Sequence, residues 1–173
     1  MPEESIAAAS AEPTAEPISL QGFRIGAHRF LIGYGAAVEL EEMSLLTGLP
    51  GAPPWVAGLV NLHGNVTVAL DWRPLLGAAA ASTAPAAGAG RRERPMLLCV
   101  RHRDDSIALI VDGLVERREF LPQDETAAAG EALPYDPWVV RAFRAPDGIW
   151  RELDIQRFLD DMRALHESAP ITH

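Results

Sequence analysis

The chain has 173 residues, of which 48% are hydrophobic, so it is long enough to bury a substantial core as one domain or two small lobes. Its formal net charge of −9 disfavours sequence-independent binding to nucleic acid, because neutralising phosphates requires clustered Lys and Arg. A single cysteine, Cys99, excludes an internal disulfide, and no apolar run reaches the roughly 18 residues of a membrane span. With no legible secretory signal at the N-terminus, these features predict a cytoplasmic protein without direct membrane insertion.

The first half of the chain reads as a disordered tail followed by short strands. Residues 1–19 are mostly Ala, Glu, Pro and Ser, a composition that cannot bury enough surface to fold. From Phe23 onward, short runs such as 29–34 and 65–71 place apolar residues at near-alternate positions between glycines and prolines, which predicts half-buried strands. The segment 78–95 then has no periodic face and is expected to be a linker.

The second half predicts more strands and one closing helix. Strands are expected at 96–103, 107–111 and 114–120, with a turn or bulge at Asp112-Gly113 between the last two. A hairpin pairs 139–144 with 149–153. Asp154 can cap a following helix, whose apolar stripe has helical spacing, and residues 166–173 are expected to be a tail. The residues of this stripe are Ile155, Phe158, Leu159 and Met162.

The chain repeats itself. Residues of a central segment recur 83 positions later, which indicates two related half-domains that share one core rather than a long array of repeats. Pro54-Trp55-Val56, Val66, Leu70-Asp71 and Leu75-Leu76 correspond to Pro137-Trp138-Val139, Ile149, Leu153-Asp154 and Phe158-Leu159. A weaker echo at a spacing of 77 relates Phe30, Ile32, Tyr34 and Val38-Glu39 to Ile107, Leu109, Val111 and Val115-Glu116.

Several chemically suggestive residues have simpler explanations. Asp71 and Asp154 recur at the same place in both copies, each before a helical turn, so capping is favoured over paired acids for hydrolysis. The five histidines lack the spacing of zinc ligands, so no metal is expected. Cys99 in an apolar strand is expected to be an inert core thiol, and no nucleotide-binding glycine motif is complete. The repeated Trp55 and Trp138 are expected in the core rather than at an interface.

Three stretches resemble the signature of CheW-type chemotaxis coupling proteins. The resemblance covers roughly residues 22–160, and the closing Trp150 to Asp154 is most similar to the pilus-associated, PilI-like branch. The signature stretches are Leu49 to Pro53, Val56 to Gly64 and Val68 to Arg73, supported by Phe30 to Glu39 and Ala108 to Val115.

The resemblance implies a mainly β fold of two intertwined five-stranded SH3-like barrels with short helical turns and a C-terminal helix, over residues 20–165. It also implies a scaffold without catalytic activity or cofactor, of the kind used in chemotaxis or type IV pilus motility. Its expected partners are a methyl-accepting chemotaxis receptor and the regulatory domain of a CheA-type histidine kinase. By position, the receptor-facing residues would be Ala37, Val38, Glu39, Gly58 and His63, with Gly64 on the kinase-facing side.

One departure from the family pattern concerns His63, which stands where the family usually has Arg. If His63 lies beside Glu39, a titratable group replaces a permanent charge in that ion pair. Receptor coupling is then expected to be weaker, or more dependent on pH, than with Arg.

Two other classes of function remain open from the residues. A small β-barrel could bind a metabolite or peptide, with Trp150 and Tyr135 lining its pocket. An enzyme could use Asp71 or Asp154, which would require a second carboxylate in the same cleft.

Overall fold

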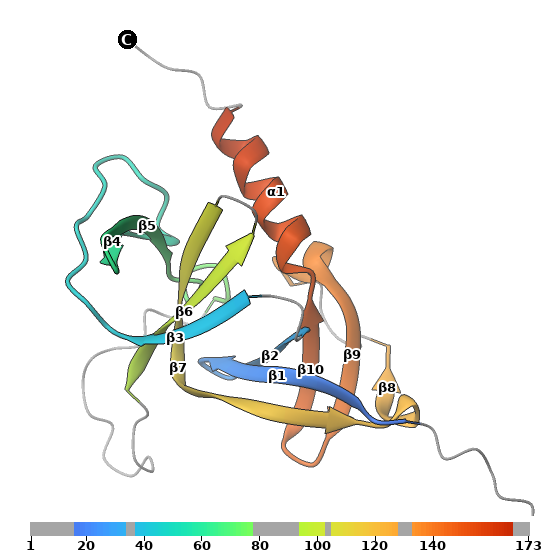
Figure 1. Ribbon diagram of the computed structural model, residues 1–173. Coiled ribbons are helices and arrows are strands. Elements are labelled where there is room, and N and C mark those ends of the chain that lie inside the picture. The colour runs from blue at the N-terminus through green and yellow to red at the C-terminus, as the bar shows by residue number, and fades with distance from the viewer. Residues whose placement is uncertain (1–15, 34–36, 78–93, 103–104, 128–132, 168–173) are drawn as a thin grey trace, which may run out of the picture.

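The computed structural model describes residues 16–33, 37–77, 94–102, 105–127 and 133–167, and it is mainly β (Figure 1). Most of the expected N-terminal tail, the linker and the C-terminal tail lie outside the described residues. The first strand begins at Ile18 and the closing helix ends at Glu167, two residues beyond each expected limit of the domain. The strands are β1 Ile18–Ile25, β2 His28–Gly33, β3 Ala37–Glu42, β4 Val56–Leu62, β5 Asn65–Leu70, β6 Pro95–His102, β7 Asp105–Phe120, β8 Glu125–Thr126, β9 Val139–Ala145 and β10 Gly148–Leu153. The helical elements are the 3-10 turns η1 Pro122–Asp124 and η2 Asp136–Trp138 and the helix α1 Ile155–Glu167.

The strands form two five-stranded barrels that share the long strand β7, as predicted. In the first barrel, β3 pairs with β6, β6 with the N-terminal half of β7, β7 with β5, and β5 with β4. In the second barrel, the C-terminal half of β7 pairs with β1, β1 with β2, β2 with β10, and β10 with β9. The barrels are intertwined because β3 follows β1 and β2 in sequence yet pairs with β6 of the other barrel (Figure 1).

The predicted interruption at Asp112-Gly113 is a bulge, so the two strands expected around it are one. Strand β7 runs without a break from Asp105 to Phe120, and Gly113 has a positive φ of 74° inside it. The pairing of β1 with β7 slips at this point, since Gly22 pairs with Glu116 but Arg24 pairs with Asp112. A glycine in this conformation lets one strand bend from the first barrel into the second.

The internal repeat is confirmed strand by strand. The bounds of β1 plus 77 are those of β6, and the bounds of β4 and β5 plus 83 are those of β9 and β10. Registers repeat as well. The antiparallel pair Phe23 with Phe30 corresponds to Val100 with Ile107, and the parallel pair of Arg151 with Phe30 corresponds to Val68 with Ile107. Every position of one barrel can therefore be compared with its counterpart in the other.

In the part of the chain that the structure describes, three apolar clusters form the core. The largest draws on strands of both barrels and on α1, and it contains an edge-to-face contact between Trp72 and Phe158 with ring centroids 4.8 Å apart. A second cluster lies in the first barrel and includes Val60 and Cys99. A third lies in the second barrel and includes Phe143 and Trp150. Because the largest cluster spans both barrels, its burial holds them together, while the other two clusters fill the individual barrels.

The predicted caps are confirmed in both copies. Asp154 accepts a hydrogen bond from the backbone N–H of Arg157 at 3.0 Å and so caps the first turn of α1. Asp71 accepts one from the backbone N–H of Arg73 at 3.0 Å, and the same carboxylate pairs with the Arg73 guanidinium. Both aspartates are therefore used in local structure.

The closing helix uses its apolar stripe as predicted. Ile155, Phe158 and Leu159 are buried, and the described α1 begins where β10 ends (Figure 1). The side chain of Met162 lies outside the described residues. Within the described parts of the chain, no helix has the length and apolar content needed to cross a membrane.

Candidate protein-binding surface

Glu39 and Glu41 share one face of β3 because side chains two positions apart in a strand point the same way. Strand β3 is held against β6 by an antiparallel ladder in which Glu39 is opposite Cys99 and Glu41 is opposite Leu97. This ladder fixes where the two carboxylates emerge on the first barrel.

A two-residue turn brings His63 to the same place. Strands β4 and β5 pair up to Leu62 and Asn65, which leaves His63 and Gly64 as the loop. Both have positive φ, 51° and 87°, as a tight hairpin turn with the right-handed strand twist requires. The backbone N–H of Gly64 also donates to the side-chain oxygen of Asn61 at 2.9 Å. The turn therefore fixes the backbone position from which the His63 side chain projects.

The predicted neighbours meet in an exposed charged cluster, defined here as Glu39, Glu41, His63 and Arg101. The His63 Nε2 atom lies 3.7 Å from Glu39 Oε1 and 3.0 Å from Glu41 Oε1, and Arg101 Nη2 lies 2.7 Å from Glu39 Oε2. The His63 side chain is 65% exposed and that of Arg101 is 63% exposed. Exposed pairs of this kind contribute at most about 1 kcal/mol each to stability. The cluster is thus available to a partner at little cost to the fold.

The other predicted site residues lie in different settings. Ala37 and Val38 precede Glu39 in β3, opposite Arg101 and Val100, and their side chains are outside the described residues. Gly58 is buried in β4, where its φ is 142° and an added Cβ would lie 2.4 Å from the backbone oxygen of Thr47. Gly58 therefore shapes the strand and does not present a side chain or an open face to a partner.

Glu41 and Arg101 complete the cluster, and the sequence reading did not single them out. The alternation of a strand was a usable signal for Glu41, since it stands two positions from Glu39. Arg101 had no such signal, because its place depends on the pairing of β3 with β6.

The carboxylates and the imidazole of this cluster could also hold a cation. One ligand atom from each of Glu39, Glu41 and His63 falls within 4.8 Å of the others. However, all three side chains reach solvent, and the second oxygen of Glu39 is engaged by Arg101. This geometry alone does not establish a metal site, and the expectation of no metal remains a prediction.

Two hollows adjoin the charged cluster. One, of about 590 Å³, lies at the end of the first barrel and is bordered by the whole cluster together with Thr67, Cys99 and Ser106. The other, of about 280 Å³, is bordered by residues of both barrels, among them Ile32, Val100 and Val140, and we call it the inter-barrel groove. Arg101 borders both hollows, so it lies between the cluster and the groove.

The pKa of the Cys99 thiol indicates a negative electrostatic potential in the first-barrel hollow. Burial, followed by the nearby carboxylates of Glu41 and Glu39, raises the pKa of its thiol to about 11, while Arg101 acts in the opposite direction. The thiol is therefore protonated at neutral pH and is not a nucleophile. The expectation of an inert buried cysteine agrees with this setting.

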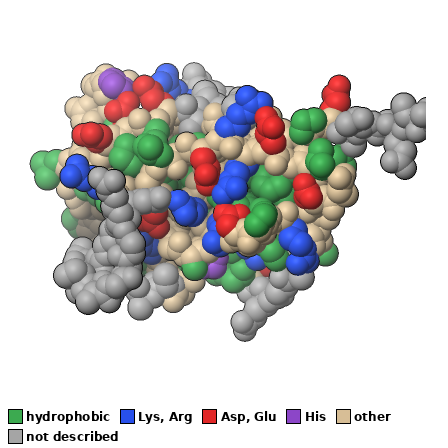
Figure 2. Space-filling view, turned by 90° about the horizontal axis from the view of Figure 1, so that it is seen from below, with side chains coloured by type: hydrophobic (Ala, Val, Ile, Leu, Met, Phe, Trp, Pro, Cys, Tyr) green, Lys and Arg blue, Asp and Glu red, His purple; other side chains and the backbone are tan. Residues whose placement is uncertain are grey.

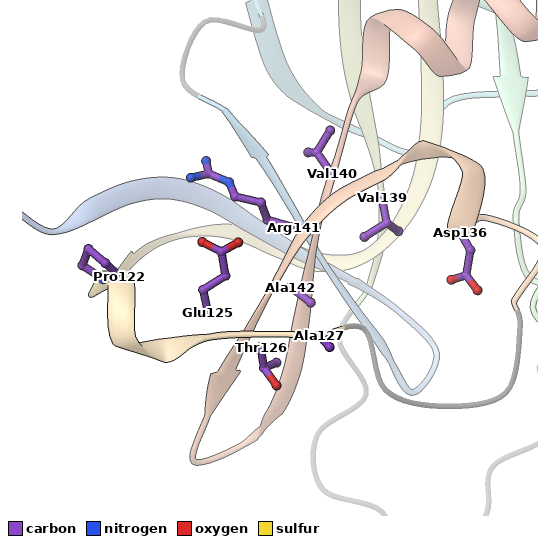
Figure 3. Close-up of a pocket in the computed structure, with 9 residues that line it drawn as sticks. All are labelled: Pro122, Glu125, Thr126, Ala127, Asp136, Val139, Val140, Arg141 and Ala142. Atoms are coloured by element: carbon purple, nitrogen blue, oxygen red, sulfur yellow. The ribbon is translucent and has the colours of Figure 1, made fainter.

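A third hollow lies away from the cluster, beside β8 and β9 (Figure 3). It has a volume of about 670 Å³, and Arg141 and Glu125 point toward each other across it. The Arg141 guanidinium also donates to Glu152 at 2.8 Å. Neither Trp150 nor Tyr135 lines this hollow. Both are at most 1% exposed and belong to separate core clusters, so the pocket expected for a metabolite is not formed by these two residues.

Charges of both signs are interspersed on the surface. On the face shown in Figure 2, Arg side chains lie next to Asp and Glu side chains around small hydrophobic areas. Such a surface suits specific contacts between proteins better than binding to a phosphate backbone.

Comparison with known proteins gives one consistent result. The family model described as "CheW-like domain" matches residues 19–163. Protein PilI of Pseudomonas aeruginosa is 30% identical over 99 residues, which are 57% of this chain and 51% of PilI. Chemotaxis protein CheW of Rhizobium meliloti is 26% identical over 114 residues, 63% of this chain and 68% of that protein. The matched part of this chain thus spans about half the length of PilI.

A solved structure supports the fold. The crystal structure of the scaffolding protein TtCheW from Thermoanaerobacter tengcongensis superposes with a TM-score of 0.63 at 15% sequence identity. The alignment covers 84% of this chain and 88% of that one. At this identity the likeness supports the two-barrel architecture alone.

Proposed function

Because the chain belongs to the CheW-like domain family, we propose that it is a non-catalytic, cytoplasmic coupling scaffold in a chemosensory or twitching-motility pathway. It joins a methyl-accepting chemotaxis receptor to the regulatory domain of a CheA-type histidine kinase. The receptor tip occupies the charged cluster and the adjoining inter-barrel groove, and the kinase domain packs beside the turn that contains Gly64.

The observation that carries the proposal is the exposed meeting of Glu39 with His63. These residues come from separate elements, β3 and the β4–β5 turn, and their ion-pair atoms lie 3.7 Å apart on a solvent-facing surface. The inter-barrel groove, which Arg101 also borders, offers charged atoms beside the apolar Val140, which is 56% exposed. This combination of a hydrophobic centre and a polar rim is typical of protein interfaces.

The test measures binding of the full chain to a receptor-tip hairpin and, separately, to the kinase regulatory domain, both from the same organism. Glu39→Ala is expected to weaken receptor binding at least about tenfold, the range for a truncated residue at the centre of an interface. Glu42→Ala is the matched control, since it removes the same charge from the opposite face of β3. Equal loss in both variants, or in neither, would contradict the proposed receptor surface.

The kinase side is tested with Gly64→Asn. An added side chain at Gly64 meets nothing within 4 Å, and Asn accepts the positive φ of this turn better than other residues with a side chain. The variant is therefore expected to fold normally but to lose kinase binding. Retention of full kinase affinity would remove Gly64 from the interface.

The identity of residue 63 is tested by measuring receptor binding from acidic to mildly alkaline pH. Native protein is expected to bind more weakly, or with a steeper dependence on pH, than His63→Arg, whose charge is permanent. Identical flat profiles for the two proteins would show that the His in place of Arg has no consequence for coupling.

A further inference from the structure

The internal repeat allows the first-barrel hollow to be compared with the same place in the second barrel. The two barrels have equivalent strands, and β5 pairs with β7 in the same register as β10 pairs with β2, so the side chains at the two places can be compared position by position. These side chains differ.

In the second barrel this place is filled by the chain itself. The Trp150 ring is fully buried, and an added Cβ at Gly22 would lie 2.7 Å from it. The Trp150 indole N–H donates to Asp147 at 3.0 Å. The guanidinium of Arg118 lies 4.2 Å above the Trp150 ring and donates to Glu116 at 3.1 Å and to Asp147 at 2.8 Å. An arginine thus closes this end of the barrel between a ring and two carboxylates.

The first barrel keeps one acidic residue of this arrangement, but it lacks the buried ring and the arginine that fill the second barrel. Its smaller residues leave the hollow of about 590 Å³, in which the hydroxyls of Thr67 and Ser106 lie 3.1 Å apart. Glu39 is kept as the counterpart of Glu116, whereas the position of Arg118 is taken by an acid. The counterparts in the first barrel are Thr67 for Trp150, Cys99 for Gly22, Glu41 for Arg118, and Glu39 for Glu116.

The exchange of Arg for Glu leaves the hollow with an excess of negative charge. Among the described residues, two carboxylates, Glu39 and Glu41, border it together with one permanent cation, Arg101, and the titratable His63. The same carboxylates help to raise the pKa of the Cys99 thiol, which reports a negative potential inside the hollow. One added cation would balance the permanent charges of these described lining residues.

We propose that the first-barrel hollow binds an arginine side chain presented by a partner protein. The guanidinium takes the role that Arg118 has in the second barrel, between the carboxylates of Glu41 and Glu39, and the apolar stem lies along Leu62 and Val66 at the rim. This deepens the proposed function and rests on it, because the arginine is presented by one of the partners that the scaffold joins.

The lining favours arginine over lysine and over an aromatic residue. A planar guanidinium can donate to two carboxylates and also to the hydroxyls of Thr67 and Ser106, whereas an ammonium is a compact donor that is more strongly hydrated. An aromatic side chain would bring no charge to the acidic rim. Val66 is 69% exposed, so it offers an apolar surface to the stem without being displaced.

The direct test titrates the full chain with the peptides acetyl-Gly-Arg-Gly-amide, acetyl-Gly-Lys-Gly-amide and acetyl-Gly-Trp-Gly-amide, observed by NMR chemical shifts. Saturable shifts centred on the amides of Thr67, Cys99 and Ser106 are expected for the Arg peptide, with an affinity at least about fivefold higher than for the other two. Equal or tighter binding of the Lys or Trp peptide, or shifts scattered over the surface, would overturn the proposal.

The decisive variant is Glu41→Arg, which installs the residue that the second barrel uses. Its guanidinium is expected to pair with Glu39 and occupy the hollow from within, so the affinity for the Arg peptide should fall at least about tenfold. Glu42→Arg is the matched control, because it makes the same charge change on the opposite face of β3 and should alter the affinity less than about twofold. Thermal unfolding of both variants verifies the fold. Unchanged binding in Glu41→Arg would overturn the assignment of the site.

Binding to the two partner proteins separates this inference from the proposed function. If native protein binds receptor and kinase and Glu41→Arg binds both equally well, the arginine site is wrong and the scaffold function stands. If the Arg peptide binds as expected but neither partner does, the scaffold function is wrong and the proposed presentation of the arginine by these partners fails with it. Loss of one partner in Glu41→Arg, but not in Glu42→Arg, identifies the protein that presents the arginine.

Discussion

The family resemblance places Gly58 on the receptor-facing surface. Replacing Gly58 with Ala tests whether this residue has a structural role or contacts the partner directly. An added Cβ would lie 2.4 Å from the backbone oxygen of Thr47 and 2.9 Å from its carbonyl carbon. Thr47 cannot move freely, because it is joined to Leu59 by two backbone hydrogen bonds of 2.8 Å. The φ of 142° at Gly58 is also unfavourable for any residue with a Cβ.

The expected loss can be estimated from these two effects. Backbone strain of this kind costs about 1–3 kcal/mol, and weakening the bridge between Thr47 and Leu59 costs about 1 kcal/mol per hydrogen bond. A decrease of about 3–5 kcal/mol in the free energy of unfolding is therefore expected, which for a chain of this size lowers the Tm by about 6–20 °C. Gly48→Ala is the control, since a Cβ there meets nothing within 4 Å.

Thermal and urea unfolding of the two variants measure the effect. Receptor binding by Gly58→Ala should be reduced only in proportion to the loss of folded protein. A variant that unfolds within about 1 °C of the native protein and yet fails to bind receptor would refute this reasoning, since it would show that Gly58 contacts the partner directly.

Three further predictions concern the second barrel, the shared core and the helix. Trp150→Ala should lower the free energy of unfolding by about 3–5 kcal/mol in urea titrations, because it empties a fully buried site, and a loss below about 1 kcal/mol would contradict the assigned packing. Burial, followed by the charge of Arg151, lowers the pKa of His28 from 6.5. As the pH falls, the unfolded chain therefore binds this proton before the folded chain does, so the free energy of unfolding should decline from pH 7 toward pH 5.5. This decline should be smaller in His28→Gln. Asp154→Ala should cost about 1 kcal/mol in the same unfolding assay by removing the cap of α1, and an unchanged midpoint would argue against that cap.

Local signals in the sequence were sufficient for the hairpins, the caps and the closing helix. The strands β9 and β10 lie within one residue of the predicted 139–144 and 149–153, because Pro146, Asp147 and Gly148 mark a turn between two apolar runs. Asp71 and Asp154 precede helical turns in both copies, which made capping predictable from position alone.

Long-range pairing could not be read in the same way. The partner of β3 is β6, more than 50 residues away, and nothing local to either strand specifies that ladder. The placement of Arg101 beside Glu39 depends on this ladder, and so does the intertwining by which each barrel takes strands from both halves of the chain. The continuity of β7 through Gly113 was also missed, because a glycine in a strand signals either a bulge or a turn until the partner strand is known.

The candidate site was predictable to the extent that the family resemblance supplied its positions. The resemblance correctly implied that Glu39 and His63 are neighbours. It also placed Gly58 among the receptor-facing residues, whereas this glycine is buried and packs closely against the backbone of Thr47. A motif gives the identity of a residue and not its exposure, so motif positions that shape a strand and those that touch a partner look alike until the backbone is known.

The two equivalent barrels are filled to different extents, which indicates that one barrel contributes more to stability and the other is open for binding. In the second barrel, Phe143 and Trp150 occupy positions that Val60 and Thr67 hold in the first, so the second barrel buries more apolar surface at the same backbone positions. Apolar burial is the main favourable term in folding, so the second barrel is expected to carry more of the stability. The first barrel has smaller interior side chains and the acidic Glu41 at its rim. It therefore gains less of that stabilisation and retains a hollow. A duplicated fold can make this exchange because the large core cluster spans both barrels, and the well-filled copy supports the one that remains open to a partner.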